Sequence, residues 1–206
     1  MNAPHTYRAA IFDLGGVLID WNPRHLYRKL FAGDDVAMER FLAEVTTPAW
    51  NRQMDAGRPF QEGIDELTRD HPEQARLIQA YFDRWPEMVG GVDAAMVAIL
   101  HDLRQHGLRL YALSDWSAET FAVARGRIRE LANFDDILIS GHALMTKPDP
   151  ALFRMALERF GLTPDETFFV DDIAANVEGA QSVGMTAVQF TSADALRATL
   201  RRWQVL

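Results

Sequence analysis

The chain has 206 residues, of which 48% are apolar, and its 21 basic and 29 acidic residues give a net charge of −8. This length suits one domain, or one domain with a smaller insertion, and the apolar fraction supports a sizeable core. The negative charge disfavours nucleic acid as a partner, because nucleic-acid binding wants a basic face. The lack of cysteine excludes disulfides and thiolate metal sites.

The start of the chain, MNAPHTYR, lacks the apolar core of a signal peptide. No apolar run approaches the roughly 18 residues needed to cross a bilayer. We therefore expect a cytoplasmic protein with no membrane partner, as a monomer or a homodimer. An anionic substrate stays open, because local charge rather than net charge decides what a cleft binds.

Five short apolar runs predict buried strands, at residues 7–12, 108–113, 136–140, 167–170 and 185–190. They lack polar and apolar alternation, so we expect them to be covered on both faces, as in a parallel sheet. Helical patterns with apolar spacings of three and four, each ending at a glycine, cover residues 92–107, 151–162 and 176–184. The alternation of strand and helix predicts an α/β fold, a Rossmann-like doubly wound parallel sheet.

One long segment breaks this alternation, because it contains helical patterns and no convincing strand. We predict that residues 21–89 form an all-helical cap inserted directly after the first strand. The α/β core would then comprise residues 1–20 and 90–206. Asp20 lies at the border between the two parts and is expected to form a hinge hydrogen bond.

Polar side chains follow the predicted strands at the edge where an open parallel sheet binds its ligands. They are Asp13, Ser114, Asp115, Lys147, Asp171 and Asp172. Each alone has an ordinary structural explanation, such as a strand-end turn or a helix cap. Together, three acids, a hydroxyl and a lysine on one edge predict an active site.

Three of these residues, Asp13, Asp171 and Asp172, would place carboxylates a few ångströms apart. Like charges that close raise one another's pKa and would not all ionise unaided. A divalent cation resolves the repulsion, and a donor set with oxygen and no sulfur favours Mg²⁺ over zinc. We therefore expect Mg²⁺ as the cofactor.

Four motifs resemble, in order, those of the haloacid dehalogenase superfamily: FDLGGVL, YALSDWS, the lysine of TKPDP, and FFVDDIAANVEGA. The resemblance covers nearly the whole chain, and the predicted helical cap lies where that superfamily places its first (C1) cap type. It implies that Asp13 and Asp172 bind Mg²⁺ directly. It also implies that the Gly15 carbonyl is a third ligand and that Asp171 helps directly or through water.

The resemblance further implies a nucleophilic role for Asp13. A carboxylate that attacks phosphorus gives an aspartyl-phosphate, which water then hydrolyses. Ser114 would hydrogen-bond a phosphoryl oxygen, and Lys147 would balance charge there and keep Asp13 ionised. These three are the candidate catalytic residues, and Asn176 has a supporting role only.

Other groups are expected to hold the phosphate. Backbone amides from Leu14 to Gly16 can point at it, because glycine lets the backbone approach closely. Asp115 joins the catalytic serine and lysine in the predicted phosphate-binding set. Trp21 and Trp116 each lie within a few residues of a catalytic loop and are candidates for the floor of the substrate pocket.

Gly15 departs from the pattern of the superfamily. Its phosphatases and mutases usually carry Asp two residues after the nucleophile, which protonates the leaving oxygen and then activates water. A mutase needs that acid in both directions and is therefore disfavoured. A phosphatase needs either a good leaving group or another proton source. If no other residue supplies the proton, activated phosphates should react faster than alkyl phosphates.

The FDLG pattern resembles a bacterial subgroup of sugar-phosphate phosphatases that act on glucose 1-phosphate. The sequence therefore predicts a Mg²⁺-dependent phosphatase for a small phosphorylated metabolite, such as a sugar phosphate. One alternative is a hydrolytic 2-haloacid dehalogenase, which also lacks the second acid. The pair Asp171 and Asp172 disfavours it, because those enzymes typically carry Ser and Asn there. The other alternative is a catalytically weak member that binds a ligand in the same cleft.

Overall fold

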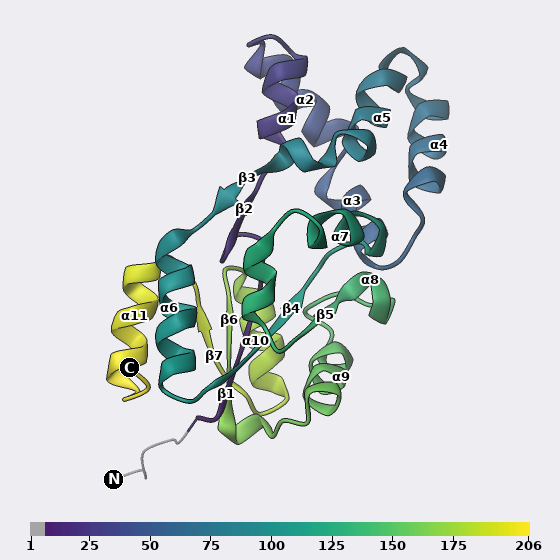
Figure 1. The fold of residues 1–206 in the computed structure, drawn as a ribbon. Helices are drawn as coiled ribbons and strands as arrows, with labels where there is room; N and C mark the ends of the chain where they lie inside the picture. Colours follow the sequence, from purple (N-terminus) through teal and green to yellow (C-terminus); the bar gives the residue numbers. More distant parts are fainter. Residues whose placement is uncertain (1–6) are drawn as a thin grey trace.

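The computed structural model describes residues 7–206 and contains an α/β core beneath a group of helices (Figure 1). The central sheet has five parallel strands in the order β5-β4-β1-β6-β7. The strands are β1 (Ala9–Phe12), β4 (Arg109–Ser114), β5 (Asp136–Ile139), β6 (Thr167–Asp171) and β7 (Thr186–Gln189). The predicted parallel sheet is confirmed. Residues 1–6, which we assigned to the core, lie outside the described range.

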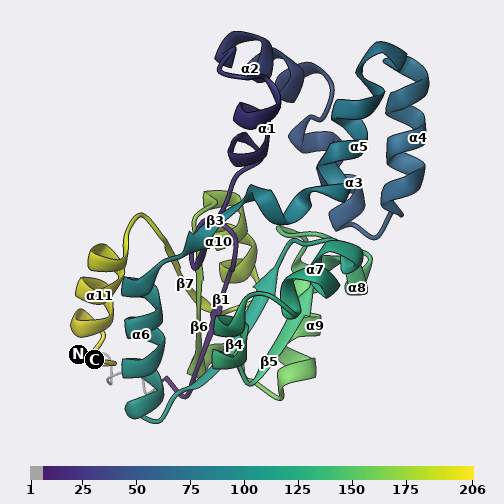
Figure 2. The same cartoon turned by 45° about the horizontal axis from the view of Figure 1, so that its top comes forward.

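Helices cover both faces of this sheet, which explains why its strands are uninterrupted apolar runs. The helices α6 (Ala94–Gln105) and α11 (Ala193–Arg202) lie side by side on one face, as Figures 1 and 2 show. The helices α9 (Pro150–Phe160) and α10 (Ala174–Ser182) pack on the other face. Within β1, Phe12 belongs to the first apolar cluster and Ile11 to the second.

The three predicted core helices end close to the expected glycines. The helix α9 ends at Gly161, which has a φ of +62°. The helices α6 and α10 stop two residues before Gly107 and Gly184, which also have positive φ. Glycine adopts this backbone conformation at little cost, so it ends the helices where the sequence indicates.

Two short antiparallel strands, β2 (Ile19–Trp21) and β3 (Val89–Val92), join the core to the helices above it (Figure 1). Between them the chain is helical, with α1 (Arg24–Leu30), α2 (Asp35–Glu44), α3 (Pro48–Asp55), α4 (Phe60–Asp70), η1 (Pro72–Gln74), α5 (Ala75–Asp83) and η2 (Trp85–Met88). The sequence prediction missed this ribbon and also missed α3.

The ribbon carries the hinge contact expected at Asp20. The Asp20 carboxylate lies 2.9 Å from His25 Nε2, at the start of α1. Gly90 of β3 packs directly against both side chains, and an added Cβ there would collide with them. A larger residue at this position would have to displace the ends of these two side chains.

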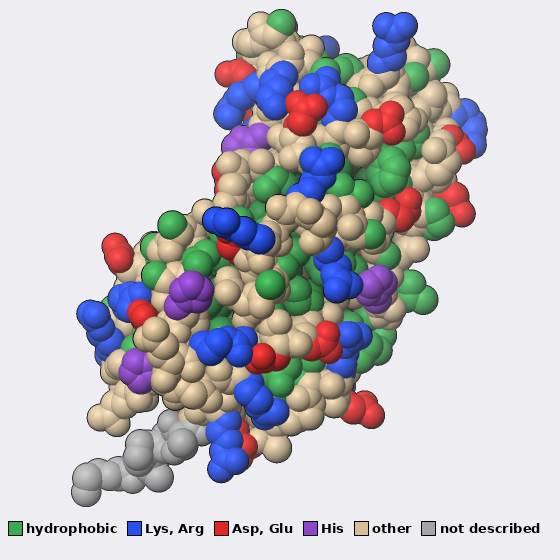
Figure 3. All heavy atoms as spheres, in the orientation of Figure 1, with side chains coloured by type: hydrophobic (Ala, Val, Ile, Leu, Met, Phe, Trp, Pro, Cys, Tyr) green, Lys and Arg blue, Asp and Glu red, His purple; other side chains and the backbone are tan. Residues whose placement is uncertain are grey.

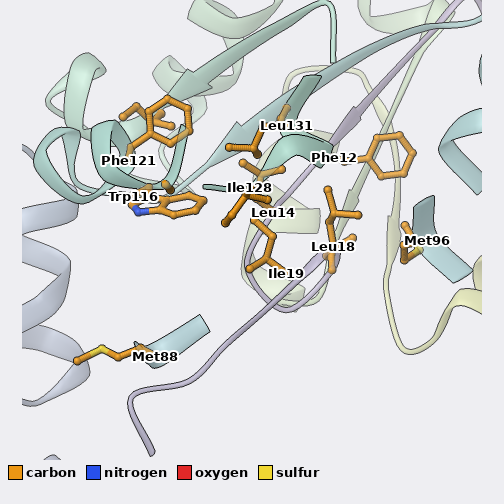
Figure 4. Close-up of a cluster of buried hydrophobic side chains, with 14 of the residues drawn as sticks. Phe12, Leu14, Leu18, Ile19, Met88, Met96, Trp116, Phe121, Ile128 and Leu131 are labelled. Carbon is orange, nitrogen blue, oxygen red and sulfur yellow. The ribbon is translucent and has the colours of Figure 1, made fainter. Parts of the chain in front are cut away.

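Four short elements connect the strands and helices of the core. They are α7 (Ala118–Arg125), η3 (Arg129–Asn133), α8 (Ser140–Ala143) and η4 (Pro164–Glu166). Leu14 of the loop after β1 and Ile19 of β2 belong to the apolar cluster that also contains Trp116, and Phe121 of α7 packs against the Trp116 ring (Figure 4). This packing fixes the loop that carries Asp13.

Acidic and basic side chains are interspersed over the face shown in Figure 3. Within residues 7–206, every helix is too short or too polar to cross a bilayer.

Candidate active site

The C-terminal ends of three adjacent strands bring the predicted residues together. Asp13 follows β1, Ser114 ends β4 and Asp171 ends β6. The backbone N–H of Asp13 donates to the Val170 carbonyl at 2.9 Å, which extends the pairing of β1 with β6 to Asp13 itself. The topology therefore sets these side chains at one edge, as the sequence predicts.

Lys147 lies between two of the acids and is only 1% exposed. Its Nζ lies 3.0 Å from Asp13 Oδ1 and 2.6 Å from Asp171 Oδ2, and it donates to the Leu113 carbonyl at 3.2 Å. Burial alone would lower the pKa of Lys147, but the neighbouring carboxylates outweigh it and raise that pKa. Lys147 therefore stays charged at the centre of the cluster.

Asp13 is buried and faces opposing influences. Burial is the largest influence and leaves the pKa of its carboxyl raised to about 7, while Lys147 and a hydrogen bond from the Ser114 hydroxyl oppose this rise. The cation and the hydroxyl thus favour the ionised form that a nucleophile requires.

Asp171 is fully buried, and its oxygens are fully engaged by neighbours. The amide of Asn176 donates to both of them, at 3.0 and 3.1 Å. The backbone N–H of Ile173 donates to Oδ1 at 2.8 Å. Asn176 therefore orients the acid that pairs with Lys147, a more specific contact than the supporting role the sequence predicts.

Three carboxylates form a cluster that suits a hard cation. Oxygens of Asp13, Asp171 and Asp172 all lie within 4.8 Å of one another. Burial, and then the charge of Asp171, raises the pKa of Asp172, and Lys147 only partly opposes this rise. An all-oxygen donor set of this kind fits Mg²⁺.

Two loop amides have partners that the phosphate-binding prediction did not include. The Leu14 N–H donates to Asp13 Oδ1 at 2.7 Å, so it faces the Asp13 carboxylate. The Gly16 N–H donates to the Ile19 carbonyl at 3.0 Å and is therefore not available to a phosphate in this structure. A tight turn, which closes this hydrogen bond, explains the difference.

Gly16 has a different function in the loop. Its φ is +74°, and a Cβ added there would lie 2.5 Å from Asp172 Oδ2. The residue is therefore required both for its backbone conformation and for the close approach of the carboxylate.

We expect Gly16→Ala to displace Asp172 and to raise the Mg²⁺ concentration for half-maximal activity about 10- to 100-fold. Gly33→Ala is the matched control, since Gly33 has a φ of +93° and an added Cβ meets no described atom within 4 Å. The measurement is the Mg²⁺ dependence of phosphate release. An equal shift in both variants would show that backbone strain, and not Asp172, is responsible.

Asp115 contacts the lysine loop. Its Oδ1 accepts the backbone N–H of Lys147 at 3.0 Å. Burial raises the pKa of Asp115, and Lys147 opposes this. Asp115 therefore holds the loop that delivers Lys147, and its contact with phosphate stays a prediction.

A cavity of about 60 Å³, with room for a few water molecules, lies between this edge and the predicted cap. Gly15 and Ser114 line its core side, and Trp21, Trp85 and Trp116 give it aromatic walls. Both tryptophans predicted to line the pocket are therefore placed there. The Trp21 indole N–H is buried with no hydrogen-bond partner in the described part of the chain.

The sequence reasoning missed two polar residues that line the same cavity from the predicted cap, and Thr120 of α7 on the core side. Asn51 and Asp55 reach it from α3, in the predicted cap. The stretch PAWNRQMD follows an N-cap threonine, Thr47, and begins with a proline. Both are helix-start signals that the prediction did not use. Even with the helix assigned, its position over the site depends on tertiary contacts.

Those contacts hold α3 against the core loops. Arg52 donates to the Lys147 carbonyl and, at 3.1 Å, to Thr146 Oγ1. The Ser140 hydroxyl donates to the Asp55 carbonyl at 2.5 Å. The loop that delivers Lys147 and the helix that carries Asp55 are thus fixed to each other beside the cavity.

Residues 7–184 match the model of the haloacid dehalogenase-like hydrolase family. The chain belongs to this family. It is 30% identical to a sesquiterpene phosphatase of Aspergillus oryzae over 96% of both chains. It is 26% identical to a phosphoglycolate phosphatase of Escherichia coli, over 93% of this chain and 84% of the other. It is 29% identical to a drimenol cyclase of Aspergillus calidoustus but spans only 36% of that protein's length.

Solved structures of haloacid dehalogenase-like proteins share the fold. One is a family enzyme of Bacteroides thetaiotaomicron in complex with magnesium and inorganic phosphate, with a TM-score of 0.68, 23% identity, and coverage of 90% and 94% of the two chains. Another is the L-2-haloacid dehalogenase of Xanthobacter autotrophicus, with a TM-score of 0.66, 18% identity, and coverage of 97% and 84%. The family assignment and hydrolase class predicted from the sequence motifs are confirmed.

Proposed function

We propose that this haloacid dehalogenase-like hydrolase is a Mg²⁺-dependent phosphatase that acts on a small phosphorylated metabolite through an aspartyl-phosphate at Asp13. The observation that carries the proposal is the contact of Lys147 with Asp13 and Asp171, beside the third carboxylate of the cluster. This arrangement pairs a nucleophile with a site for a hard cation. The phosphatase relatives support the choice of phosphorus as the reaction centre.

The mechanism follows from what each side chain touches. Asp13 attacks phosphorus as the bond to the leaving oxygen breaks, and water then attacks the aspartyl-phosphate and releases phosphate. Lys147 keeps Asp13 ionised, and Ser114 orients it and contacts a phosphoryl oxygen. Mg²⁺, held by Asp13, Asp172 and the Gly15 carbonyl, would offset the repulsion between two anions.

The predicted cap provides the specificity surface in this proposal. Residues 21–89 would open at the β2–β3 ribbon to admit substrate, because the cavity of about 60 Å³ has room for only a few water molecules. The walls formed by Trp21, Trp85 and Trp116 suit an apolar group or the flat face of a sugar ring. Sugar phosphates and terpenoid phosphates are therefore the first substrates to test.

The dehalogenase alternative is weaker. Likeness to a dehalogenase structure at 18% identity shows the fold alone. A displacement of halide at carbon needs no cation, whereas Asp171 and Asp172 supply two further acids beside Asp13. The charge of the site therefore favours phosphate over a haloacid.

We expect release of phosphate from p-nitrophenyl phosphate in the presence of Mg²⁺, and loss of at least about 100-fold after chelation, as for removal of a main electrostatic stabiliser. Adding Mg²⁺ back should restore the rate. A rate unaffected by chelation, together with halide release from a 2-haloacid, would establish the dehalogenase instead. Activity on neither substrate class would support the ligand-binding alternative.

A further inference from the structure

The proposed phosphatase has no acidic side chain at Gly15, but the predicted cap places an acid in the same cavity. Asp55, the last residue of α3, lines the cavity together with Gly15 and Ser114. It lies close enough to the nucleophile to be influenced by the charge of Asp13. No role has been assigned so far to this carboxyl.

Asp55 is held in place at both its side chain and its backbone. Asn51 donates to Asp55 Oδ2 at 2.8 Å, and the backbone N–H of Ser117 also donates to the carboxylate. The Asp55 carbonyl accepts the Ser140 hydroxyl at 2.5 Å. Contacts from Asn51 of the same helix, from Ser117 at the start of α7 and from Ser140 at the start of α8 therefore fix this acid above the site.

We infer that Asp55 is the proton donor to the leaving oxygen, and that the predicted cap thereby supplies the acid that Gly15 lacks. This inference rests on the proposed phosphatase function. As Asp13 bonds to phosphorus, the departing oxygen keeps the electron pair of the broken bond and takes the proton of the Asp55 carboxyl. In the second step the Asp55 carboxylate takes a proton from the water that attacks phosphorus, which restores both side chains.

The surroundings of Asp55 suit this role. Burial, and then the Asp115 carboxylate, raises the pKa of Asp55 to about 7, and Arg52 opposes the shift. The other ionisable groups that face it are Asp13 from the core and Tyr81 from α5. An acid that is partly protonated near neutral pH can give and take a proton in one cycle.

The space at Gly15 allows a separate test of whether an acid there could replace Asp55. A Cβ added there would meet no described atom within 4 Å, so this structure leaves room for a side chain beside the nucleophile. An aspartate at this position would face the cavity that Asp55 enters. The two positions should therefore serve the same leaving oxygen.

The test compares kcat/KM for phosphate esters of increasing leaving-group pKa, from p-nitrophenyl phosphate to simple alkyl phosphates. This parameter reports the steps up to departure of the leaving group. For Asp55→Asn we expect a change of less than about threefold on p-nitrophenyl phosphate, whose leaving group needs no proton. On alkyl phosphates we expect a loss of about 10²- to 10⁴-fold.

Asp65→Asn is the matched control. Asp65 is exposed on α4 and accepts a side-chain amide from Gln61 at 2.7 Å, with the same spacing of four residues as Asn51 and Asp55. It should leave the whole series unchanged. For each variant, the ratio of kcat/KM on p-nitrophenyl phosphate to kcat/KM on an alkyl phosphate does not depend on the folded fraction. Partial misfolding therefore does not obscure the result. Should Asp55→Asn not fold at all, Asn51→Ala tests the same ratio.

The double variant Asp55→Asn with Gly15→Asp should regain at least about tenfold on alkyl phosphates. An equal loss across the series in Asp55→Asn would overturn the inference and assign Asp55 to substrate binding or structure. A lack of any loss would overturn it too, and a double variant with no gain would contradict a shared leaving oxygen. Failure of the proposed function itself is distinct, since the wild type would then release phosphate from no ester.

Discussion

Replacing Asp13 with Asn is expected to reduce Mg²⁺-dependent phosphate release by at least about 10⁴-fold, as for loss of a nucleophile. Asparagine has nearly the same shape but no charge, and its amide is a poor nucleophile toward phosphorus. Lys147 would keep its 2.6 Å partner Asp171, so the fold should survive. The measurement is the initial rate with p-nitrophenyl phosphate, with thermal unfolding recorded alongside.

Comparing the initial rate of Asp13→Asn with its melting temperature separates a chemical role of Asp13 from a structural one. A variant that melts within a few degrees of the wild type and is inactive supports a direct chemical role for Asp13. A variant that keeps activity within tenfold of the wild type would rule out Asp13 as the nucleophile. Ser114 would then be the next candidate, because its hydroxyl lies at the same strand ends and hydrogen-bonds Asp13.

Lys147→Met is the second large effect that we expect. The substitution leaves the Asp13 and Asp171 carboxylates buried without their shared cation. Breaking a buried ion pair in this way costs about 3–5 kcal/mol of unfolding free energy. For a chain of this size that corresponds to a fall in Tm on the order of 10 °C.

Activity should also fall in Lys147→Met, because the pKa of Asp13 should rise. Lys147 lowers the pKa of Asp13, so its removal raises that pKa and reduces the ionised fraction at neutral pH. The activity that remains should therefore shift to higher pH. Chemical denaturation and a pH profile, each with and without Mg²⁺, measure both effects.

A double variant separates charge from packing. Asp171→Asn added to Lys147→Met removes one of the two unbalanced carboxylates and should recover part of the lost stability. Equal stability of Lys147→Met and the wild type would mean that the ion pairs contribute nothing. No recovery in the double variant would attribute the loss to packing of the lysine side chain.

The sequence predicts the sheet because its strands are buried on both faces and therefore read as continuous apolar runs. Once the strands are placed, their parallel order brings Asp13, Ser114 and Asp171 to one edge. The position of Lys147 followed only from its motif, since the loop between α8 and α9 has no periodic pattern. The contact with Asp171 came from the structure.

The parts that were missed depend on tertiary packing. The strands β2 and β3 are short and contain Asp20, Gly90 and Gly91, which are unfavourable in strands. Asp55 lies 42 residues after Asp13 in the sequence. Only the docking of α3 onto the core loops, through Arg52 and Ser140, brings it to the cavity.

The central claim is a covalent bond between phosphorus and Asp13, and detection of that species tests it most directly. Wild-type protein would be mixed with p-nitrophenyl phosphate and Mg²⁺, quenched in acid within a turnover, digested and measured by mass spectrometry. The account predicts one phosphoryl group on the peptide that contains Asp13, removable with hydroxylamine and missing from Asp13→Asn. A phosphoryl group on another residue, in protein that turns over normally, would contradict it.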